Sequence, residues 1–338
     1  MRFENVAIVG VAHVDAPHRI TTDALEAPLK ETYARVGLPQ RFLEPLTGVR
    51  ARRFWAPGTL PSDAAALAGQ RVLEQTGVRA ERVGVLINTS VSRDYLEPSV
   101  ACFVHSKLGL AETCLNFDVA NACLGFLDGM QIVGNMIERG QIDYGLVVDG
   151  ESSRHVVEST VERLRQPTCD ERTVREQLAT LTVGSGAAAM LLAHERLAPG
   201  GHRFVGAVSL AATQHNQLCR GQADFGVTDA KSLLEQGVLL AQRTWARAQQ
   251  ELGWTSESTD LIALHQVSAL NTQEVARVLG LDLSKAPLIY PELGNVGPAS
   301  IPILLSKALE QERLGPGDRV VLAGIGSGLN CTAAAVTW

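Results

Sequence analysis

The feature of this 338-residue chain that most constrains its fold is an alternation of short, continuous apolar runs with longer amphipathic segments. Continuous apolar runs are typical of strands buried on both faces of a sheet that helices cover. The pattern therefore predicts an α/β protein. The expected strands are Val6–Val11, Arg82–Asn88, Leu115–Val119, Tyr144–Asp149, Ala187–Leu192, Phe204–Ala211, Leu261–His265, Leu288–Tyr290, Arg319–Leu322 and Cys331–Trp338. The expected helices are Pro61–Gln75, Cys123–Arg139, Ser232–Leu252, Asn271–Leu279 and Ile301–Arg313.

The chain divides most clearly at Gly200–Gly201, which gives an N-terminal half (1–199) and a C-terminal half (200–338). Strands and helices recur in the same order in both halves, which is compatible with a duplicated fold although no sequence repeat is present. The charge-rich segment Ser152–Leu181 interrupts the alternation. We expect residues 152–181 to be an insertion that caps the core.

Composition and charge exclude several classes of protein. Apolar residues make up 46% of the chain and charged residues 20%, as in a globular protein rather than a disordered one. The net charge is −6 and no basic run is present, which argues against a nucleic-acid partner. No apolar run approaches the ~18 residues that cross a bilayer. The N-terminus reads as a strand rather than a signal peptide, so we expect a cytoplasmic protein without a membrane span.

The cysteines are scattered singly, with no C-x-x-C pair, so neither a zinc ribbon nor a thioredoxin-like site is encoded and no metal is expected. In a chain of this size without a secretion signal, reduced thiols are the expected state. The six are Cys102, Cys114, Cys123, Cys169, Cys219 and Cys331.

Cys123 is the first candidate for chemistry. In FDVANACLGF an apolar strand ends, small residues follow, and the cysteine falls where a helix should begin. The positive end of a helix and its free N–H groups favour the thiolate, which is the form that attacks carbonyl carbons. Taken alone, this context fits a nucleophile and a buried structural cysteine equally well.

Three further motifs carry polar groups at places where a site can form. His265 ends an apolar strand, Asn295 lies in GNVGPAS, and Ser327 lies in the glycine turn GIGSG. An asparagine amide can donate to an oxyanion, but an asparagine between glycines is also an ordinary turn residue. The glycine turn is no dinucleotide loop, because only eight residues follow Asn330 and they read as a strand. It still offers backbone N–H groups.

Glu97 is a candidate general base in the polar loop that follows the strand at 82–88. A loop carboxylate is more often solvated than catalytic, so its position alone is weak evidence for a general base.

Together, and in this order along the chain, DVANACLGF, HQ, GNVGPAS and GIGSG resemble the thiolase superfamily, in particular its β-ketoacyl-ACP synthase III branch. The order Cys123, His265, Asn295 matches the triad of that branch. The segment INTSVSRDYLEPS, with a glutamate 26 residues before the cysteine, is similar to the OleA family of head-to-head acyl-CoA condensing enzymes. The resemblance covers essentially the whole chain.

The resemblance implies a five-layered α-β-α-β-α fold of two similar halves, and a homodimer. It also implies a mechanism. Cys123 is acylated by one long-chain acyl-CoA, with the N–H groups of Cys123 and Ser327 as oxyanion hole. His265 and Asn295 hold the thioester oxygen of a second acyl-CoA, and Glu97 from the partner subunit removes its α-proton. The product is a β-keto acid for olefin or ketone biosynthesis.

On the same resemblance, coenzyme A thioesters are substrates and no separate cofactor is expected. The downstream enzymes of the olefin pathway are the implied partners. The stretch Thr47–Phe54 departs from the wider branch, because Leu46 precedes it where a CoA-contacting arginine can occur. We therefore assign no residue to the CoA phosphates and expect Arg50, Arg52 and Arg53 to be structural or interfacial.

Three alternatives stay open at this point. A decarboxylative synthase that uses malonyl-ACP would need the same triad but not Glu97, and a related enzyme could make pyrones or diketides. An acyl-CoA thioesterase would resolve the acyl-cysteine with water and would not need a second oxyanion site. A non-catalytic scaffold has no support, since every motif position is filled.

Overall fold

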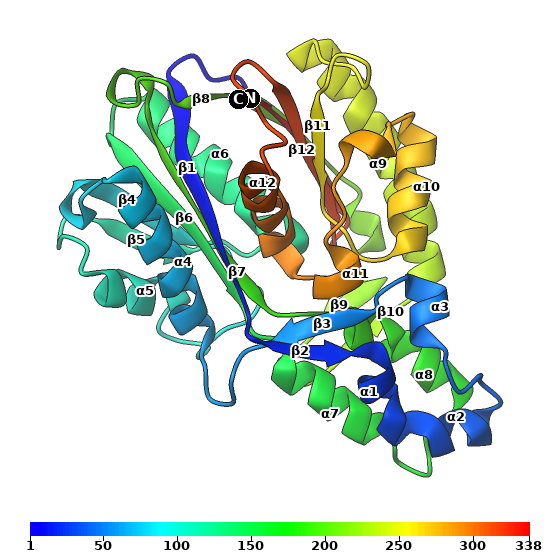
Figure 1. The fold of residues 1–338 in the computed structure, drawn as a ribbon. Coiled ribbons are helices and arrows are strands. Elements are labelled where there is room, and N and C mark those ends of the chain that lie inside the picture. The colour runs from blue at the N-terminus through cyan, green and yellow to red at the C-terminus, as the bar shows by residue number, and fades with distance from the viewer.

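The computed structural model describes all 338 residues and shows one nine-stranded mixed sheet, in the order β11-β12-β13-β8-β1-β7-β6-β4-β5. Its strands are β1 (Val6–Asp15), β4 (Val83–Asn88), β5 (Leu115–Asp118), β6 (Tyr144–Glu151), β7 (Gly186–His194), β8 (His202–Ala211), β11 (Leu261–Leu264), β12 (Arg319–Gly326) and β13 (Asn330–Thr337). Strand β1 joins β8 only at Ala7–Arg203 and Ile8–His202. The two parts of the sheet therefore diverge from this seam and face each other (Figure 1).

Helices fill the space between the two parts of the sheet and cover both outer faces (Figure 1). Helices α6 (Gly125–Glu138) and α12 (Ser300–Glu310) lie between them. Helices α4 (Pro61–Thr76) and α5 (Val100–Leu108) cover the β1–β5 side, and α9 (Ala230–Leu252) and α10 (Ala269–Leu279) cover the other. This order of layers confirms the expected five-layered α/β fold.

The central layer requires helices that can be buried on all sides. The largest apolar cluster runs through α6, α12 and the inner faces of both sheets. Two glycines let α6 approach closely: a Cβ at Gly129 would lie 2.9 Å from Cγ1 of Val147, and one at Gly134 would lie 3.0 Å from the ring of Phe3. Larger side chains at these positions would push α6 away from the sheet.

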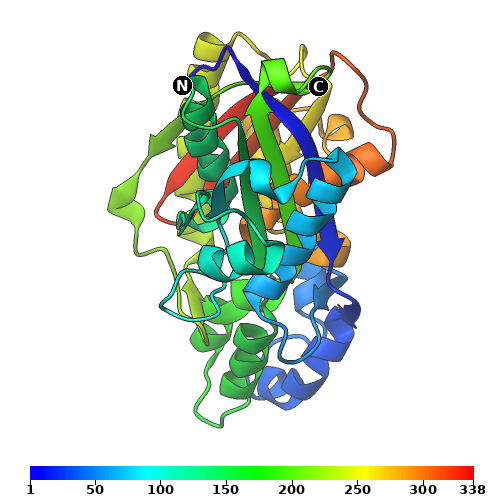
Figure 2. The ribbon, with the colours of Figure 1, turned by 90° about the vertical axis from the view of Figure 1, so that its left-hand side faces the viewer.

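A cap lies at one end of the layered core (bottom of Figures 1 and 2). Residues 152–181 contribute α7 (Arg154–Leu164) and α8 (Glu171–Gln177) to it. They pack against residues 18–54, which form β2 (His18–Thr21), α1 (Thr22–Glu26), α2 (Lys30–Val36), α3 (Leu43–Thr47) and β3 (Ala51–Phe54). No sequence pattern predicted the helices and strands of this second segment. The cap has an apolar cluster of its own, which includes Leu29, Tyr33, Leu43, Val157, Leu164 and Val174.

The strand expected at Leu288–Tyr290 is wrong. These residues are irregular and lead into the short helix α11 (Tyr290–Leu293), whose first turn holds a proline. The N–H groups of Ile289 and Tyr290 donate to Oε1 of Gln266 instead of to a neighbouring strand. The remaining pair of short strands, β9 (Cys219–Gly221) and β10 (Gly226–Thr228), forms a separate ribbon.

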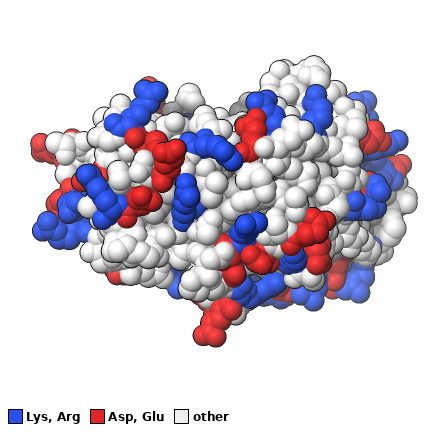
Figure 3. Space-filling model, turned by 90° about the horizontal axis from the view of Figure 1, so that it is seen from above, with Lys and Arg blue, Asp and Glu red and all other residues white.

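Charged side chains of both signs are interspersed on the face seen from above, and no continuous basic patch is present there (Figure 3). Exposed arginines pair with nearby acids, as Arg19 does with Glu292 at 2.8 Å and Arg41 with Asp23 at 2.6 Å. No helix combines the length and the apolar character that crossing a membrane requires.

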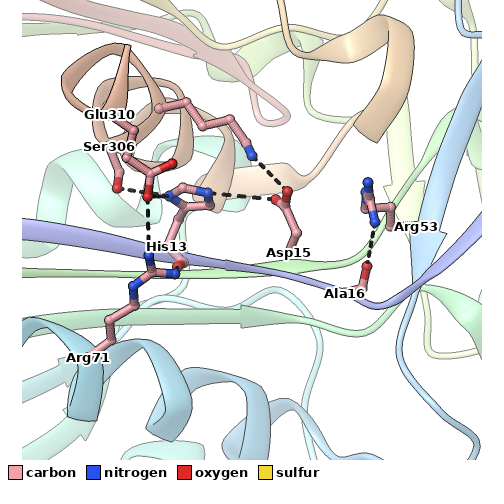
Figure 4. A network of polar contacts seen from close by, with 8 residues as sticks. His13, Asp15, Ala16, Arg53, Arg71, Ser306 and Glu310 are labelled. Carbon is pink, nitrogen blue, oxygen red and sulfur yellow. Dashed lines mark hydrogen bonds and ion pairs between the residues drawn. The ribbon is translucent and has the colours of Figure 1, made fainter. Parts of the chain in front are cut away.

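A polar network around the buried His13 fastens β1 to the helices on its two sides (Figure 4). Its Nδ1 lies 2.8 Å from Oγ of Ser306 in α12, and Arg71 in α4 donates to its carbonyl oxygen at 2.8 Å. Nearby, Nζ of Lys307 donates to Oδ2 of Asp15 at 2.7 Å. Strand β1 is therefore linked to both the central and the outer helical layer.

We predict that His13 makes folding stability depend on pH. Burial, followed by the charge of Lys307, lowers the pKa of His13 in the folded protein. As the pH falls below about 6.5, the unfolded chain takes up the proton first and the folded state loses stability. The stability advantage of the wild type over His13→Asn should therefore shrink between about pH 7.5 and 5, as measured by urea unfolding. An advantage that stays constant or grows over this range would contradict the prediction.

Candidate active site

Cys123 lies in a 3₁₀ turn, Ala122–Leu124, that leads directly into α6. The preceding Ala122 has a φ of +44°, in the left-handed region that side chains with a Cβ rarely adopt. The side chain of Asn121 holds this turn: its Nδ2 donates to Asp128 in α6 at 2.6 Å, and its Oδ1 accepts from Asn330 in β13 at 3.0 Å. The cysteine is thus held at the start of α6, where the sequence places it.

The thiol of Cys123 is protonated in the resting protein. Burial, then the Cys219 thiol and the Glu151 carboxyl, raises its pKa to about 12, although its own backbone N–H acts in the other direction. The N–H group at the start of the helix favours the thiolate, as expected, but in the free protein desolvation and the neighbouring acids outweigh its effect on the pKa. The thiol must lose its proton during attack.

Two glycines of β12 lie on the same face of the strand and allow His265 and Cys123 to approach that face closely. A Cβ at Gly326 would lie 3.6 Å from the backbone N of Cys123, and a Cβ at Gly324 would lie 3.0 Å from Cβ of His265. Ser327 directly follows this close approach. The glycine turn therefore lies beside the nucleophile, where its backbone N–H groups can serve an oxyanion.

His265 is held by its backbone and has a free side chain. It follows β11, its N–H donates to the carbonyl of Ala323 at 2.8 Å, and it is 8% exposed. Neither ring nitrogen forms a well-aligned hydrogen bond, and the backbone of Gly297 lies close to the ring. Burial lowers its pKa to about 4, opposed by the backbone of Gly297, so the ring is neutral at pH 7. A buried ring without partners is costly, and a substrate oxygen would satisfy it.

Asn295 is fixed so that its amide nitrogen stays free. Its N–H donates to Thr182 at 3.0 Å and its carbonyl accepts from Gly184 at 2.8 Å. Its side-chain Oδ1 accepts from the N–H of Gly297 at 2.9 Å, which leaves Nδ2 as a free donor. The turn Gly297–Ala299 packs against the turn that holds Cys123. The fold therefore brings Cys123, His265 and Asn295 together.

Glu97 does not lie beside these three residues. It is exposed on the loop between β4 and α5 and forms no hydrogen bond or ion pair within the chain. Its neighbour Leu96 is 92% exposed. The single chain thus does not bring Glu97 into contact with the other candidate residues.

Two buried acids near Cys123 were missed by the sequence analysis. Asp149 accepts from Oγ1 of Thr89 at 2.7 Å, and Glu151 accepts from Oγ of Ser92 at 2.6 Å. Burial is the main cause that raises the pKa of both carboxyls. The signal that could have found them is the pair of acids at the end of an apolar strand.

The arginines of the 50–53 stretch have local partners or none. Arg50 pairs with Glu292 at 3.2 Å, and Arg53 donates to the carbonyl of Ala16 at 3.3 Å. Arg52, in β3 of the cap, is fully buried, and its guanidinium nitrogens have no hydrogen-bond partner. No group of three or more histidine, cysteine or acidic side chains is arranged to hold a metal ion.

Chemically, the site combines a buried thiol, a neutral histidine with open nitrogens, a free amide donor and backbone N–H groups. This set can form and resolve a thioester on cysteine, with two separate places for a carbonyl oxygen.

Comparison with known proteins gives consistent matches along the chain. Residues 117–212 match the family described as 3-oxoacyl-(acyl-carrier-protein) synthase III, and residues 249–338 match its C-terminal region. Acyl-CoA:acyl-CoA alkyltransferases of Xanthomonas campestris and Shewanella oneidensis are 48% and 37% identical, each over the full length of both chains.

Solved structures of OleA also match this chain over nearly its whole length. Cerulenin-bound OleA of X. campestris superposes with a TM-score of 0.99, covers 100% of this chain and 98% of its own, and is 48% identical. A cysteine-to-serine variant of that OleA, with bound lauric acid and lauroyl-CoA, superposes with a TM-score of 0.98 and covers 99% of this chain and 100% of its own, at 48% identity.

We predict that alkylation of Cys123 by iodoacetamide continues to accelerate with pH up to about pH 10, because its pKa lies far above the usual ~8.5 of a thiol. Peptide mass spectrometry would follow Cys123 separately from the other cysteines. The same peptide in urea-denatured protein is the control and should level off near its ordinary pKa. A plateau at or below about pH 8.5 in the folded protein would show that the thiolate is stabilised instead.

Proposed function

The chain belongs to the OleA family, in the β-ketoacyl-ACP synthase III branch of the thiolase superfamily, and from that premise we propose that it condenses two long-chain acyl-CoA molecules head to head. The observation that carries the proposal is the spacing of the chemical groups. Glu97 precedes Cys123 by 26 residues and His265 follows it by 142. The same intervals separate the glutamate, cysteine and histidine positions substituted in structures of X. campestris OleA.

The first half of the reaction is acylation of Cys123. Its thiol attacks the thioester carbonyl of the first acyl-CoA and passes its proton to the neutral ring of His265. The backbone N–H groups of Cys123 and Ser327 stabilise the tetrahedral oxyanion. The C–S bond to coenzyme A breaks, the leaving thiolate takes up the proton, and an acyl-cysteine remains.

The second half begins when a second acyl-CoA binds with its thioester oxygen between His265 and Asn295. A neutral imidazole can donate one hydrogen bond, and Nδ2 of Asn295 is free to donate another. Both bonds strengthen as negative charge develops on this oxygen, which acidifies the α-carbon. Because no malonyl carboxylate is lost, a base must remove the α-proton.

Glu97 supplies that base from the partner subunit of a homodimer. Strand β5 pairs only with β4 and ends the sheet, and its Leu115 is exposed next to an unpaired strand edge. Together with the exposed Leu96, this edge is the kind of apolar surface that a second copy covers. In this arrangement Glu97 crosses the interface and reaches the second acyl-CoA.

Carbon–carbon bond formation completes the reaction. The carbanion attacks the acyl carbonyl on Cys123 and the C–S bond breaks, which frees the enzyme. Water then cleaves the β-ketoacyl thioester into coenzyme A and a β-keto acid. Coenzyme A enters only with the substrates, and no other cofactor takes part. We place the enzyme in the cytoplasm, beside the enzymes that convert the β-keto acid into an olefin.

We predict that the purified protein converts myristoyl-CoA, as the sole substrate, into a twenty-seven-carbon ketone. This is the β-keto acid of two myristoyl chains after loss of carbon dioxide. CoA release is followed with a thiol reagent and the products are identified by mass spectrometry. Myristic acid alone would mean that water resolves the acyl-enzyme and would favour a thioesterase, and ketone formation that requires malonyl-ACP would favour a decarboxylative synthase.

We predict that Glu97→Ala lowers ketone formation about 10²- to 10⁴-fold but leaves the first release of coenzyme A within about twofold, since only the later step needs the base. Glu97→Gln is the matched control that keeps size and removes the charge, and it should behave in the same way.

A mixture of protomers tests whether Glu97 acts across the interface. Glu97→Ala protomers keep only residual activity alone, and Cys123→Ala protomers keep none. When co-expressed, they should regain up to about a quarter of wild-type activity per protomer, because mixed dimers hold one complete site. Absence of any recovery in dimers shown to be mixed would place Glu97 in its own subunit's site.

A further inference from the structure

Glu151 lies where the interior of the site meets the loop that carries Glu97. It is the last residue of β6, 6% exposed, and its charge is one cause of the shifted pKa of the Cys123 thiol. A Cβ at Gly297, in the turn that follows Asn295, would lie 3.5 Å from its carboxyl carbon. The carboxyl group of Glu151 therefore lies against the turn that follows Asn295 and close to the thiol of Cys123.

All the hydrogen bonds of this carboxyl group come from the beginning of the Glu97 loop. Oε1 accepts from the N–H of Val91 at 2.6 Å. Oε2 accepts from Ser92 twice, from its hydroxyl at 2.6 Å and from its N–H at 3.2 Å. No residue of the loop between 93 and 99 contacts Glu151 in this way. Glu151 thus holds the start of the loop and leaves its tip, with Glu97, free to project.

A second carboxyl group holds the far end of the same loop. Asp118, the last residue of β5, accepts from the N–H groups of Val100 and Ala101 at 3.0 and 2.9 Å, where α5 begins. Arg93 in the loop also approaches it at 3.5 Å. Two strand-end carboxylates therefore fix both ends of a segment whose middle is exposed.

We propose that Glu151 is a positioning residue for the condensation step, which together with Asp118 holds loop 91–99 so that Glu97 meets the second acyl-CoA in one orientation. The inference rests on the function proposed above, because it gives Glu151 no role unless Glu97 is the base.

The chemistry of the contacts explains why a carboxylate is needed. A carboxylate accepts at both oxygens, and charge-assisted bonds to N–H and O–H donors are stronger than neutral ones. Gln has the same shape but only one acceptor oxygen, so in Glu151→Gln the amide NH₂ would face the backbone N–H of either Val91 or Ser92. The start of the loop must then shift, and Glu97 shifts with it.

The test separates the two half-reactions of Glu151→Gln in the homodimer, with myristoyl-CoA as substrate. Ketone formation should fall about 10- to 100-fold, as for a base displaced by ~1 Å. The first release of coenzyme A should stay within about twofold, and more of the acyl-enzyme should end as myristic acid. Alkylation of Cys123 should shift to lower pH, because a negative charge beside the thiol is removed.

Three variants serve as comparisons. Ser92→Ala removes one of the donors and should give a smaller loss of ketone in the same direction. Asp118→Asn loosens the other end of the loop and should slow ketone formation without moving the alkylation profile of Cys123. Glu138→Gln is the matched control: Glu138 accepts from Glu4 and Asn5 in the same manner, but at the far end of α6, so it should behave as the wild type.

A double-mutant cycle decides whether Glu151 acts through Glu97. In a Glu97→Ala background, Glu151→Gln should cause no further loss in the residual condensation rate or in coenzyme A release. Multiplied losses, equal losses in both half-reactions, or undiminished ketone formation by folded Glu151→Gln would each overturn the inference. If the proposed function itself were wrong, the outcome would differ from these: the wild type would make no ketone, or Glu97→Ala would make as much ketone as the wild type.

Discussion

Burial of two helices between the two parts of the sheet is the constraint on which the rest of this structure depends. Helices α6 and α12 contribute to one apolar cluster with both inner sheet faces. The turns that precede them, Ala122–Leu124 with Cys123 and Gly297–Ala299 after Asn295, pack against each other. Because neither helix can move without opening the core, the residues that precede them are held as firmly as the core itself. The catalytic groups thus gain their precision from packing rather than from contacts among themselves.

The same burial makes the resting site electrically neutral. It raises the pKa of the Cys123 thiol and lowers that of the His265 ring, so the pair holds a thiol and an imidazole rather than a thiolate and an imidazolium. A neutral imidazole can accept the thiol proton in one half-reaction and donate a hydrogen bond to the second thioester in the other. The buried acids Glu151 and Asp149 also raise the pKa of the thiol and so favour its protonated form.

The sequence predicted the layered fold, which the structure confirms, and it proposed a catalytic set whose members the structure brings together, because both leave local patterns. Buried strands read as apolar runs, and Cys123, His265 and Asn295 each follow a recognisable turn or strand end. The cap segment 18–54 was missed because its elements are only four to seven residues long and carry no clear period. The role of Glu151 was missed for another reason: its partners lie 60 residues away, and only the folded chain brings them together.

The proposed mechanism divides the reaction between a buried interior and an exposed loop. The groups proposed for acylation lie in one chain, on elements fixed by the core. The proposed base for condensation lies on a segment whose apolar tip is exposed and whose ends are held by carboxylates at the ends of β5 and β6. Asp94, within this segment, also accepts from the N–H of Ser62 at 2.9 Å. The exposed tip becomes buried only when another surface covers it. Under the proposed mechanism, a single chain holds the groups for acylation, and the carbon–carbon step requires the homodimer. Dimerisation then also decides whether the acyl-enzyme is hydrolysed or condensed.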